Sequence, residues 1–531
     1  MNFNNLKFNF GKGDEMDKLK EILLSEIPGF KETGLKFLNK EITKMEFKGV
    51  SGGFGAYAHR DGQSFMIRLR IPSGITSKEE LKIIYDMAKK YNLDHIHLTT
   101  RQAIQFHGLS IEDICEVMEE GLKHNIYTRG AGGNYPRNVA MSPLSGVDPN
   151  EIFDVTPYAI AANNHFLQKI YTYKLPRKLK VAFSNNNLDE GHCTVHDLGF
   201  VACKKDNKDY FKVFLGGGLG RNPKLSLELD ELVEPKDVLY HIEAMTNLFI
   251  NEGNYENKSK ARIRYMVEKL GEEGFLNEYK KYLKQAKEKG GLDVNPEPIN
   301  YTKEGLETTI QDKRLFKQKQ SGLYSVYFHP IGGQLSMKDF KVILDELDKI
   351  ENPIIRLAMT EGIYFINLNG KEAESMLKAT SKLGGETALE QSVSCIGVPI
   401  CQMGLLESQK ELNSIVDYFR EHNFNSDILP RIHISGCGNS CGVHQIGEIG
   451  LTGKMKRVND KSTGVFELHI GGNVGVGKAA LGECYGDIEF SKVPEFLYEI
   501  ALKIKDSNKD FCTWVKENNS ELREIVTKFA V

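Results

Sequence analysis

Four cysteines in two close pairs are the residues of this 531-residue chain with the clearest chemical potential. Cys395 and Cys401 lie in "SCIGVPIC", and Cys437 and Cys441 lie in "GCGNSC". Structural zinc sites usually take tighter pairs, with about two to four residues inside each pair and about 12–20 between the pairs. Here five residues separate Cys395 from Cys401, and 35 residues separate the two pairs. This spacing favours a four-iron iron–sulfur cube over zinc, and four ordinary buried cysteines are the third interpretation.

The composition narrows the class of protein. The formal net charge is −3, so the chain carries no global basic field for nucleic acid. No apolar run approaches the length of a membrane span, and the opening "MNFNNLKFNFGKGDEMDKLK" lacks the apolar core of a signal peptide. Nine cysteines at uneven spacings argue against a secreted disulfide framework. The sequence therefore predicts a cytoplasmic protein without a membrane or nucleic-acid partner. The five isolated cysteines are predicted to be small buried hydrophobes: Cys115, Cys193, Cys203, Cys484 and Cys512.

An internal repeat indicates which elements position these residues. Residues 74–109 and 333–368 align over 36 positions without a gap, and eleven positions are identical. Each copy opens with an amphipathic helix, as in "SKEELKIIYDMAKK", and closes with alternating strands such as "HIHL" and "AIQFHGL". A second similarity joins "LPRKLKVAFS" from Leu175 to "LPRIHISGCG" from Leu429. The chain is therefore predicted to be α+β, with two halves of the same plan and a lysine-rich helical connector near 277–291.

The two halves differ in the chemistry they carry. Four basic or imidazole side chains of the first half align with uncharged residues of the second: Arg68, Arg101, His107 and Lys178 with Tyr327, Thr360, Ile366 and Ile432. Basic residues thus gather in one half and paired cysteines in the other. If the halves pack about a pseudo-twofold axis, we expect the cation cluster and the thiol cluster to meet at the interface. The alternative for each cation alone is a solvated surface residue.

Two glycine-rich stretches suggest nucleotide binding only weakly. "GGNVGVGKA" (471–479) resembles a phosphate-binding loop, but Ala479 stands where that loop needs a hydroxyl for magnesium. "LGGGLGR" (215–221) does not match the dinucleotide fingerprint. No flavin or nicotinamide module and no built-in ferredoxin motif is visible in the sequence. An oxidoreductase built on this chain would therefore take its electrons from a separate carrier.

Several motifs, in this order, resemble the siroheme-containing nitrite and sulfite reductases. They are "FMIRLRIPSG", "TTRQAIQFHG", "NYPRNV", "LPRKLKV", "GGGLGR", the Cys395/Cys401 pair and "GCGNSCGVHQIGEIGLTG". The resemblance runs from about residue 50 to 480. It implies a trilobal α+β fold with two pseudo-symmetric halves, each with a ferredoxin-like repeat and a larger cofactor-clasping α/β domain. The implied domains are an N-terminal extension (1–48), ferredoxin-like half-repeats (49–120 and 311–385), a siroheme and substrate domain with the connector (121–310), and a 4Fe-4S and siroheme domain (386–531).

The resemblance also implies roles for residues. The four paired cysteines bind a 4Fe-4S cube, and Cys441 also bridges to the siroheme iron. The siroheme carboxylates are met by Arg101, Gln105 and His107. The substrate anion lies among Arg68, Arg137, Lys178 and Lys180. Arginines suit oxyanion binding because of their bidentate forks, whereas the two lysines are predicted to supply protons.

The implied function is the six-electron reduction of nitrite to ammonia or of sulfite to sulfide, with electrons from ferredoxin or a similar donor. "NSCG" followed by "IGLTG" favours nitrite, whereas Lys180 is a feature of sulfite enzymes and of some bacterial nitrite enzymes. A non-catalytic iron–sulfur or zinc-binding protein is the alternative of a different class. Because small ferredoxins are usually acidic, the basic segment "GKMKRVNDK" (453–461) is the predicted docking site, and 311–320 is its alternative.

Overall fold

The structure is a computed structural model that describes residues 13–531. The first twelve residues of the predicted N-terminal extension lie outside the described part. The rest of that extension forms helices α2 (Gly13–Leu38) and α3 (Lys44–Ser51). A capping box starts α3, because Thr43 Oγ1 accepts the N–H of Glu46 while the Glu46 carboxylate accepts the N–H of Thr43. Among the described residues, no helix is long and apolar enough to cross a membrane.

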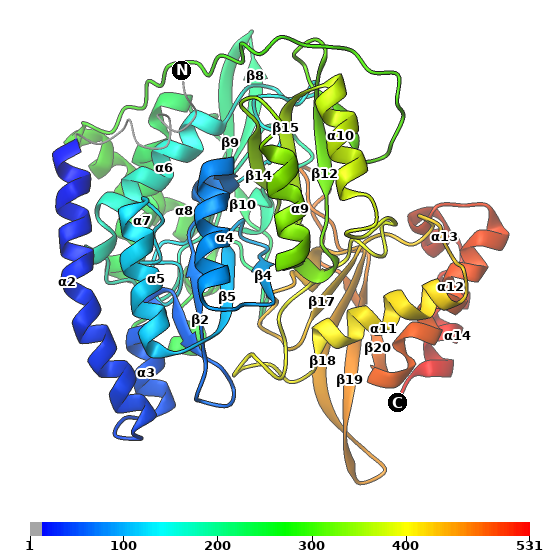
Figure 1. Cartoon of the computed structure of the whole chain (residues 1–531). Helices are drawn as coiled ribbons and strands as arrows, with labels where there is room; N and C mark the ends of the chain where they lie inside the picture. The colour runs from blue at the N-terminus through cyan, green and yellow to red at the C-terminus, as the bar shows by residue number, and fades with distance from the viewer. Residues whose placement is uncertain (1–12) are drawn as a thin grey trace.

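Two five-stranded antiparallel sheets correspond to the predicted repeats (Figure 1). The first has the order β1 (Ala56–Ala58), β2 (Phe65–Leu69), β5 (Ile104–Leu109), β4 (His95–Leu98) and β13 (Gln334–Ser336). The second has the order β11 (Leu315–Lys317), β12 (Leu323–Phe328), β15 (Ile363–Asn369), β14 (Ile354–Leu357) and β3 (Ile75–Thr76). The last strand of each sheet comes from the other half of the chain. This exchange ties the two ferredoxin-like units into one body.

The exchanged strands obey the pseudo-twofold symmetry. Gln334 pairs with His97, and its repeat counterpart Ile75 pairs with Arg356, the counterpart of His97. Each exchanged strand follows a tight turn that ends in a glycine, Gly74 (φ 72°) or Gly333 (φ 71°). A Cβ at either glycine would lie 2.7 Å from a backbone oxygen of the opposite half. Both turns therefore need glycine in order to bring the halves together.

The helices of the repeats cover the two ferredoxin-like sheets. They are α4 (Lys78–Lys90), α5 (Ile111–Lys123), α9 (Met337–Leu347) and α10 (Gly370–Thr380). The amphipathic pattern predicted for α4 is confirmed, since Leu81, Ile84 and Ala88 are buried. Helices α4 and α9 lie side by side (Figure 1). Tyr85 of α4 meets Phe340 of α9 edge-on, with ring centroids 5.4 Å apart. The repeat contacts its own copy, as a pseudo-twofold arrangement requires.

Two further five-stranded sheets are mixed and also share one plan. The first runs β6 (Ala140–Met141), β7 (Val181–Ser184), β8 (Leu198–Lys205), β9 (Lys208–Leu215) and β10 (Leu227–Glu228). The second runs β16 (Val393–Ser394), β17 (Ile432–Ser435), β18 (Ile449–Val458), β19 (Lys461–Ile470) and β20 (Glu483–Glu489). In each, the first three strands are parallel and the remaining pairs antiparallel. The predicted α+β fold of two related halves is confirmed.

The strand register corrects the second sequence similarity by three residues. Val181 pairs with Leu198 at the start of β7, and Ile432 pairs with Ile449 at the start of β17, so Val181 and Ile432 are equivalent. The repeat counterpart of Lys178 is therefore Leu429 rather than the predicted Ile432. Lys180 aligns with Arg431, so one cation of the pair does have a basic counterpart. The shared letters "LPR" aligned the wrong residues because the two loops before the strands differ in length.

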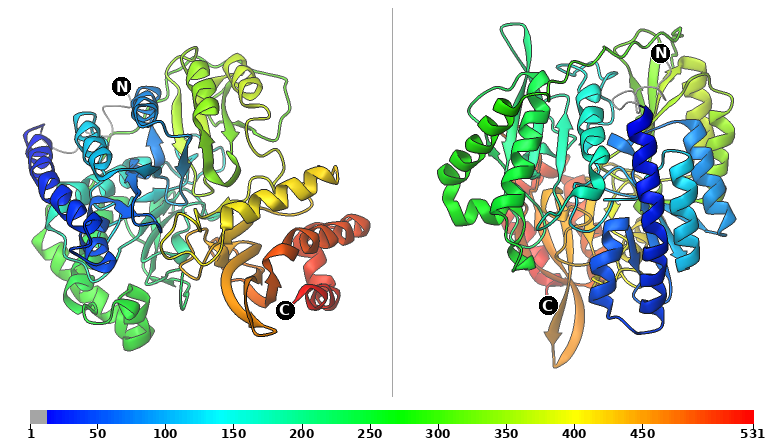
Figure 2. Two further views of the ribbon diagram at one scale, coloured as in Figure 1. Left: turned by 60° about the horizontal axis from the view of Figure 1, so that its bottom comes forward. Right: turned by 90° about the vertical axis from the view of Figure 1, so that its left-hand side faces the viewer.

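Helices on the outside complete the halves (Figure 2). The first half adds α6 (Thr156–Gln168), α7 (Val238–Glu252) and α8 (Ile263–Lys289), and the second half adds α11 (Ser408–Glu421), α12 (Val493–Ser507), α13 (Phe511–Glu517) and α14 (Asn519–Phe529). Helix α8 spans the predicted lysine-rich connector as far as Lys289 and breaks at Gly271 (φ 73°). One hydrophobic core extends over residues 19–377 and another over residues 389–529. The site lies between these two cores.

Candidate cofactor and anion site

All eleven predicted site residues line one cavity between the halves. The cavity holds about 1860 Å³ of empty space counted out to its mouth. Its lining includes Arg68, Arg101, Gln105, His107, Arg137, Lys178, Lys180, Cys395, Cys401, Cys437 and Cys441. Residues from four separate segments of the first half thus meet two loops of the second. The expected convergence of the cation cluster and the thiol cluster is present in the structure.

The thiols come from two loops at the carboxyl ends of neighbouring parallel strands. Cys395 follows β16 directly, and the loop carrying Cys437 and Cys441 follows β17. The N–H of Gly436 donates to Cys395 Sγ at 3.2 Å, and the Ser408 hydroxyl lies 3.3 Å from the same sulfur. A backbone donor of this kind stabilises negative charge on a sulfur ligand, whereas the Ser408 hydroxyl donates its proton to the Cys395 carbonyl at 2.7 Å. No three His, Cys, Asp or Glu side chains within residues 13–531 are grouped so as to hold a single metal ion.

The cavity wall is strongly cationic. Eight basic side chains line it, against one acidic side chain, Glu361. Burial and the neighbouring guanidinium groups of Arg262 and Arg137 lower the pKa of Lys178 to about 7. Burial and the nearby Lys178 charge lower the pKa of Lys180 well below its ordinary value. Gathering so many positive charges costs the cofactor-free protein folding free energy. The same wall is suited to a ligand with several negative charges.

Backbone carbonyls hold the predicted arginines in place. Arg68 Nη1 donates to the Ala131 carbonyl at 2.8 Å, and Arg137 Nη2 donates to the Gly133 carbonyl at 2.8 Å. Arg101 Nη1 bonds to His196, while its Nε is buried without a protein partner. Neutral acceptors fix these guanidinium groups without cancelling their charge. The charge is left for an anion in the cavity.

Several lining residues were missed at the sequence level. Arg70 could have been found, because it lies two residues after Arg68 on one strand face. The pair Asp197–Arg262, which lies behind the lining, could not be found from the sequence, since neither residue belongs to a recognised motif. Asp197 is fully buried; its carboxylate accepts from Arg262 Nη2 at 3.0 Å and from the N–H of Lys180 at 2.8 Å. It positions the lysine segment from behind the cavity.

Glycine loops reach from each half onto the other. Gly220 (φ 105°) exchanges hydrogen bonds of 2.8 Å with the Gln445 side chain, and Gly475 (φ 116°) lies beside the carbonyl of Asn187. The segment 471–479 is followed by strand β20 rather than by a helix, so it is not a phosphate-binding loop. The glycines in both stretches permit the halves to interlock around the site.

The first half lacks thiols at the equivalent positions. The N–H of Ser142 donates to its neighbouring strand at 3.0 Å, as the N–H of Cys395 does at 3.1 Å. By the strand register, Ser142, Asn186 and Glu190 occupy the places of Cys395, Cys437 and Cys441. The symmetry that builds the fold therefore does not duplicate the ligand set.

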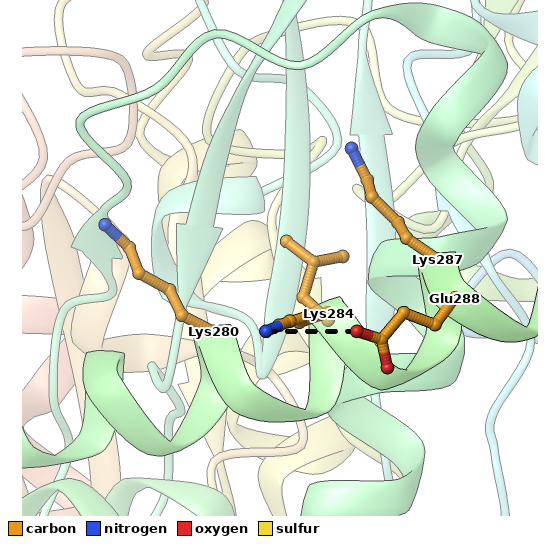
Figure 3. A pocket seen from close by; sticks show the side chains of 5 residues that line it. Lys280, Lys284, Lys287 and Glu288 are labelled. Atoms are coloured by element: carbon orange, nitrogen blue, oxygen red, sulfur yellow. Dashed lines mark ion pairs between the residues drawn. The ribbon is translucent and has the colours of Figure 1, made fainter.

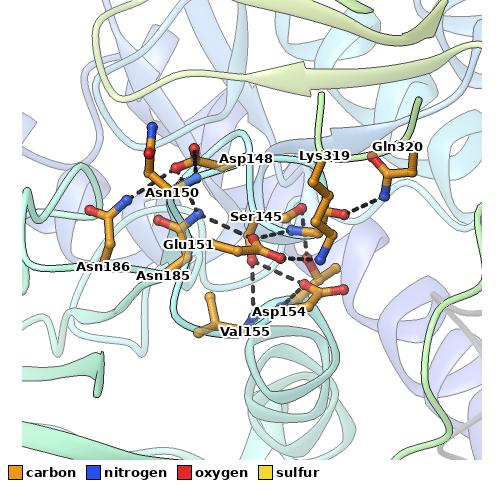
Figure 4. Close-up of polar contacts among 12 residues, drawn as sticks. Ser145, Asp148, Asn150, Glu151, Asp154, Val155, Asn185, Asn186, Lys319 and Gln320 are labelled. Carbon is orange, nitrogen blue, oxygen red and sulfur yellow. Dashed lines mark hydrogen bonds and ion pairs between the residues drawn. The ribbon is translucent and has the colours of Figure 1, made fainter. Parts of the chain in front are cut away.

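A network of direct hydrogen bonds occupies this equivalent region (Figure 4). Asn186 Nδ2 donates to the Asp148 carboxylate at 3.0 Å, and Asn185 Nδ2 donates to Glu151 at 3.3 Å. The Lys319 ammonium pairs with Glu151 at 2.5 Å. These side chains bond directly to one another, although Asn185 Oδ1 is buried without a partner, so the first half fills the region where the second half contributes thiols to the cavity.

Another hollow lies on the exposed face of α8 (Figure 3). It is lined by Lys280, Leu283, Lys284, Lys287 and Glu288. Lys284 pairs with Glu288 at 3.9 Å, and Lys280 and Lys287 pair with carboxylates outside it at 2.9 and 2.8 Å. None of the predicted site residues is here. Solvated ion pairs of this kind contribute little to stability or binding.

Four thiols beside a cationic anion pocket define an iron–sulfur oxidoreductase. The family model described as the nitrite and sulphite reductase 4Fe-4S domain matches residues 132–287. The model of the nitrite/sulfite reductase ferredoxin-like half domain matches residues 57–124. Together these two matches, within residues 57–287, support the nitrite and sulfite reductase family for this chain.

Similar proteins span most of the chain. The chloroplastic ferredoxin–nitrite reductase of Arabidopsis thaliana is 25% identical, with 94% of this chain and 88% of that protein covered. A ferredoxin sulfite reductase of Mycolicibacterium paratuberculosis is 24% identical, with 78% and 74% covered. The solved structure of Mycobacterium tuberculosis NirA protein covers 96% of this chain and 97% of its own, with a TM-score of 0.77 and 21% identity. The last similarity shows the shared fold.

Siroheme and a 4Fe-4S cluster are the cofactors of this family, and the cavity fits both. The four thiols supply the ligands that such a cluster needs. Siroheme is a polycarboxylate, and the partnerless Nε of Arg101, together with eight cationic side chains, suits its charge. Zinc, the alternative from spacing, would leave this cationic wall without a counter-charge.

Proposed function

We propose that the chain reduces nitrite to ammonium at this cavity, with sulfite reduction to sulfide as the second candidate. The observation that carries the proposal is the meeting of four thiols from one half with Arg68, Arg137, Lys178 and Lys180 from the other in one cavity. A six-electron reduction needs electron storage beside an anion-binding, proton-donating wall. The named relatives include both nitrite and sulfite reductases, which is why both substrates are retained.

The residues would divide the work as follows. Cys395, Cys401, Cys437 and Cys441 would hold the cluster, which supplies electrons when bound. Arg101, Gln105 and His107 would hold the siroheme carboxylates. Arg68 and Arg137 bind the substrate oxygens through fixed guanidinium forks. Lys178 donates protons to those oxygens, because desolvation and neighbouring cations lower its pKa to about 7, so that it releases its proton readily. Lys180 shares this role from the same strand end.

Parallel assays of the two anions test the substrate. The purified chain is assayed with nitrite and with sulfite, with reduced methyl viologen as electron donor. We expect turnover of both and a higher kcat/KM for nitrite. A higher kcat/KM for sulfite would make sulfite reduction the main activity. An absorption spectrum without siroheme bands, together with no turnover of either anion, would favour the non-catalytic iron–sulfur or zinc-binding alternative.

We also propose an external ferredoxin-like donor and a cytoplasmic location. The predicted docking segment 453–461 forms the tip of the β18–β19 hairpin, and three of its four cations are paired. Lys456 lies 3.0 Å from Asp487, Arg457 lies 3.0 Å from Asp460, and Lys454 contacts Glu467. These carboxylates weaken the field that an acidic carrier would meet. Nine thiols without a disulfide support a reducing compartment.

A surface beside Cys401 suits the donor better. Arg60 Nη1 donates to the Gly404 carbonyl at 2.8 Å, and Lys44 Nζ donates to the Arg60 carbonyl at 3.4 Å. Neither cation forms an ion pair with any residue of the 13–531 region. Met403 (48% exposed) and Leu405 (47%) lie in the same loop. This surface therefore combines unpaired cations with exposed apolar side chains, and it lies in the loop that follows the proposed cluster ligand Cys401. Such a surface fits an acidic electron carrier.

Charge reversal on this surface tests the docking site. We expect Lys44→Glu with Leu405→Glu to raise the KM for a ferredoxin roughly tenfold and to flatten its salt dependence, because rim charges act through steering. Turnover with reduced methyl viologen should stay at the parent value, since a small dye needs no docking. Lys456→Glu with Arg457→Glu serves as the matched comparison. A larger ferredoxin KM in that variant would return the docking site to the hairpin.

A further inference from the structure

A chain of hydrogen-bonded side chains connects the protein surface to the cavity. Asp61 is exposed in the loop between β1 and β2, and its carboxylate accepts from Ser64 Oγ at 2.6 Å. Ser64 Oγ lies 3.1 Å from His59 Nδ1, and His59 Nε2 lies 3.3 Å from His107 Nδ1. His59 and His107 both line the cavity. The first two contacts are within reach of proton transfer between heteroatoms, and the His59–His107 contact at 3.3 Å is just longer, so transfer across it needs a small approach of the two rings.

The outer part of this chain is held rigidly. The second Asp61 oxygen accepts the backbone N–H groups of Gln63 at 2.9 Å and Ser64 at 3.1 Å. His59 N–H donates to the Ser64 carbonyl at 2.7 Å. The N–H of Arg60 donates to the Ile400 carbonyl at 2.9 Å, next to the cluster ligand Cys401. The loop is therefore fixed to the wall of the site rather than free in solvent.

Gln105 sets the proton positions along the chain. Its amide satisfies all neighbours when its nitrogen donates to His107 Nε2 at 3.1 Å and its oxygen accepts from Arg68 at 3.0 and 2.9 Å. His107 then carries its proton on Nδ1 and donates to His59, which donates to Ser64. Ser64 in turn donates to Asp61. Every donor points outward, which is the arrangement left after one proton has passed inward and Asp61 has become a carboxylate.

Neutral imidazoles are suited to such transfer. Burial lowers the pKa of His59 below its ordinary value, although the Asp61 charge opposes this shift. Burial and the charges of His97 and His59 lower the pKa of His107 well below its ordinary value. A neutral imidazole can accept a proton at one nitrogen while it releases one from the other. The third histidine of the wall, His97, lies outside the chain because its Nδ1 faces Gln334 at 3.2 Å.

The proposed reaction consumes many protons. Nitrite takes six electrons and eight protons to give ammonium and two waters, and the external donor supplies the electrons. Lys178 and Lys180 hold at most one transferable proton each, so they must be recharged several times in each turnover. We propose that Asp61, Ser64, His59 and His107 form the path by which protons enter the cavity from solvent; this inference rests on the proposed function.

Each inward passage balances. Before each passage the Gln105 amide presents its oxygen to His107 Nε2–H at 3.1 Å. This N–H bond breaks as its proton passes to the neutral amine of Lys178 or Lys180 in the same cavity, where a new N–H bond forms, and His107 Nδ1 gains the proton from His59. His59 receives the Ser64 proton, Ser64 receives the Asp61 proton, and Asp61 takes a proton from water. The side chains then turn back to their starting orientation. No electron moves along this path.

Two substitutions and one control test the path with reduced methyl viologen and saturating nitrite. We expect His59→Ala to lower kcat about 100-fold with little change in KM, and added imidazole to restore part of the loss. Ser64→Ala should lower kcat about tenfold and increase the solvent deuterium isotope effect. Ser64 is absent from the cavity wall, so its loss should leave the siroheme spectrum unchanged. His124→Gln, an exposed histidine on another face, should match the parent.

A readout without turnover tests the same hydrogen bonds. In protein labelled with ¹⁵N-histidine, His59 and His107 should give the neutral Nδ1–H signature, and Ser64→Ala should shift only the His59 signal strongly. A parent kcat in both His59→Ala and Ser64→Ala would overturn the path and leave the cavity mouth as the entry for protons. A parent inactive with nitrite and sulfite would instead overturn the proposed function, and the path with it.

Discussion

We expect Cys441→Ser to lower nitrite and sulfite turnover by at least about 100-fold. Loss of a side chain that only orients a metal ligand typically costs 10–100-fold, and loss of a ligand costs at least as much. By family resemblance, Cys441 would be the thiol that serves both the cluster and the siroheme, and its place between the two halves suits that proposed role. Thr100 Oγ1 donates to the backbone carbonyl of Cys441 at 2.9 Å, and this bond ties the thiol loop to the "TTRQ" segment of the first half. The Cys441 side chain lines the cavity with the cationic wall.

Iron content, the absorption spectrum and turnover are measured together. The Cys441→Ser protein should contain less iron and show altered bands, because serine oxygen is a poor replacement for a thiolate ligand. Cys512→Ser is the matched control, since Cys512 lies outside the cavity and is exposed, as is Cys484; the prediction that these two thiols are buried is wrong. The Cys512→Ser protein should keep both the spectrum and the turnover of the parent. Parent-like turnover by Cys441→Ser would remove this thiol from the ligand set.

The sequence predicted the repeat unit well but not how the two copies join. Leu81, Ile84 and Ala88 follow a helical period, and they are buried in α4 as expected. Strands β3 and β13 are only two and three residues long, too short for any period to show. Their exchange between sheets depends on the turns at Gly74 and Gly333, whose role becomes visible only when a carbonyl of the other half lies 2.7 Å from the missing Cβ.

The site was predictable where charge or thiol patterns differed between the halves. Arg68, Arg101 and His107 were identified because the second copy lacks them, and all three line the cavity. His59 was missed because it belongs to no recognised motif and meets His107 only through pairing of separate strands. Glu361 was missed because its importance is its burial beside Cys395, where it accepts the N–H of Ser394 at 3.0 Å. Such residues act through three-dimensional contacts that spacing does not encode.

Lys178→Met should separate catalysis from stability. Methionine keeps much of the lysine stem and removes its charge and its proton. We expect kcat to fall about 100-fold, because one positioned proton donor is worth roughly 10²–10⁴, and KM to rise because a cation near the substrate is gone. The siroheme bands should persist, since the thiols and Arg101 are untouched. Lys174→Met, the same change on an exposed residue four positions earlier, should have no effect.

Although Lys178→Met should lower turnover, it should raise the thermal stability of the cofactor-free chain. Burial lowers the folded-state pKa of Lys178 to about 7, whereas the unfolded lysine keeps its ordinary value. Between pH 7 and the ordinary lysine pKa of about 10.4 the unfolded chain binds more protons, so stability rises with pH; below pH 7 the full cost of the buried charge is present. Lys178→Met removes that cost, so its gain in Tm over the parent should be larger at pH 6 than at pH 9. An equal or lower Tm at pH 6, together with parent turnover, would mean that Lys178 is a solvated charge outside the site.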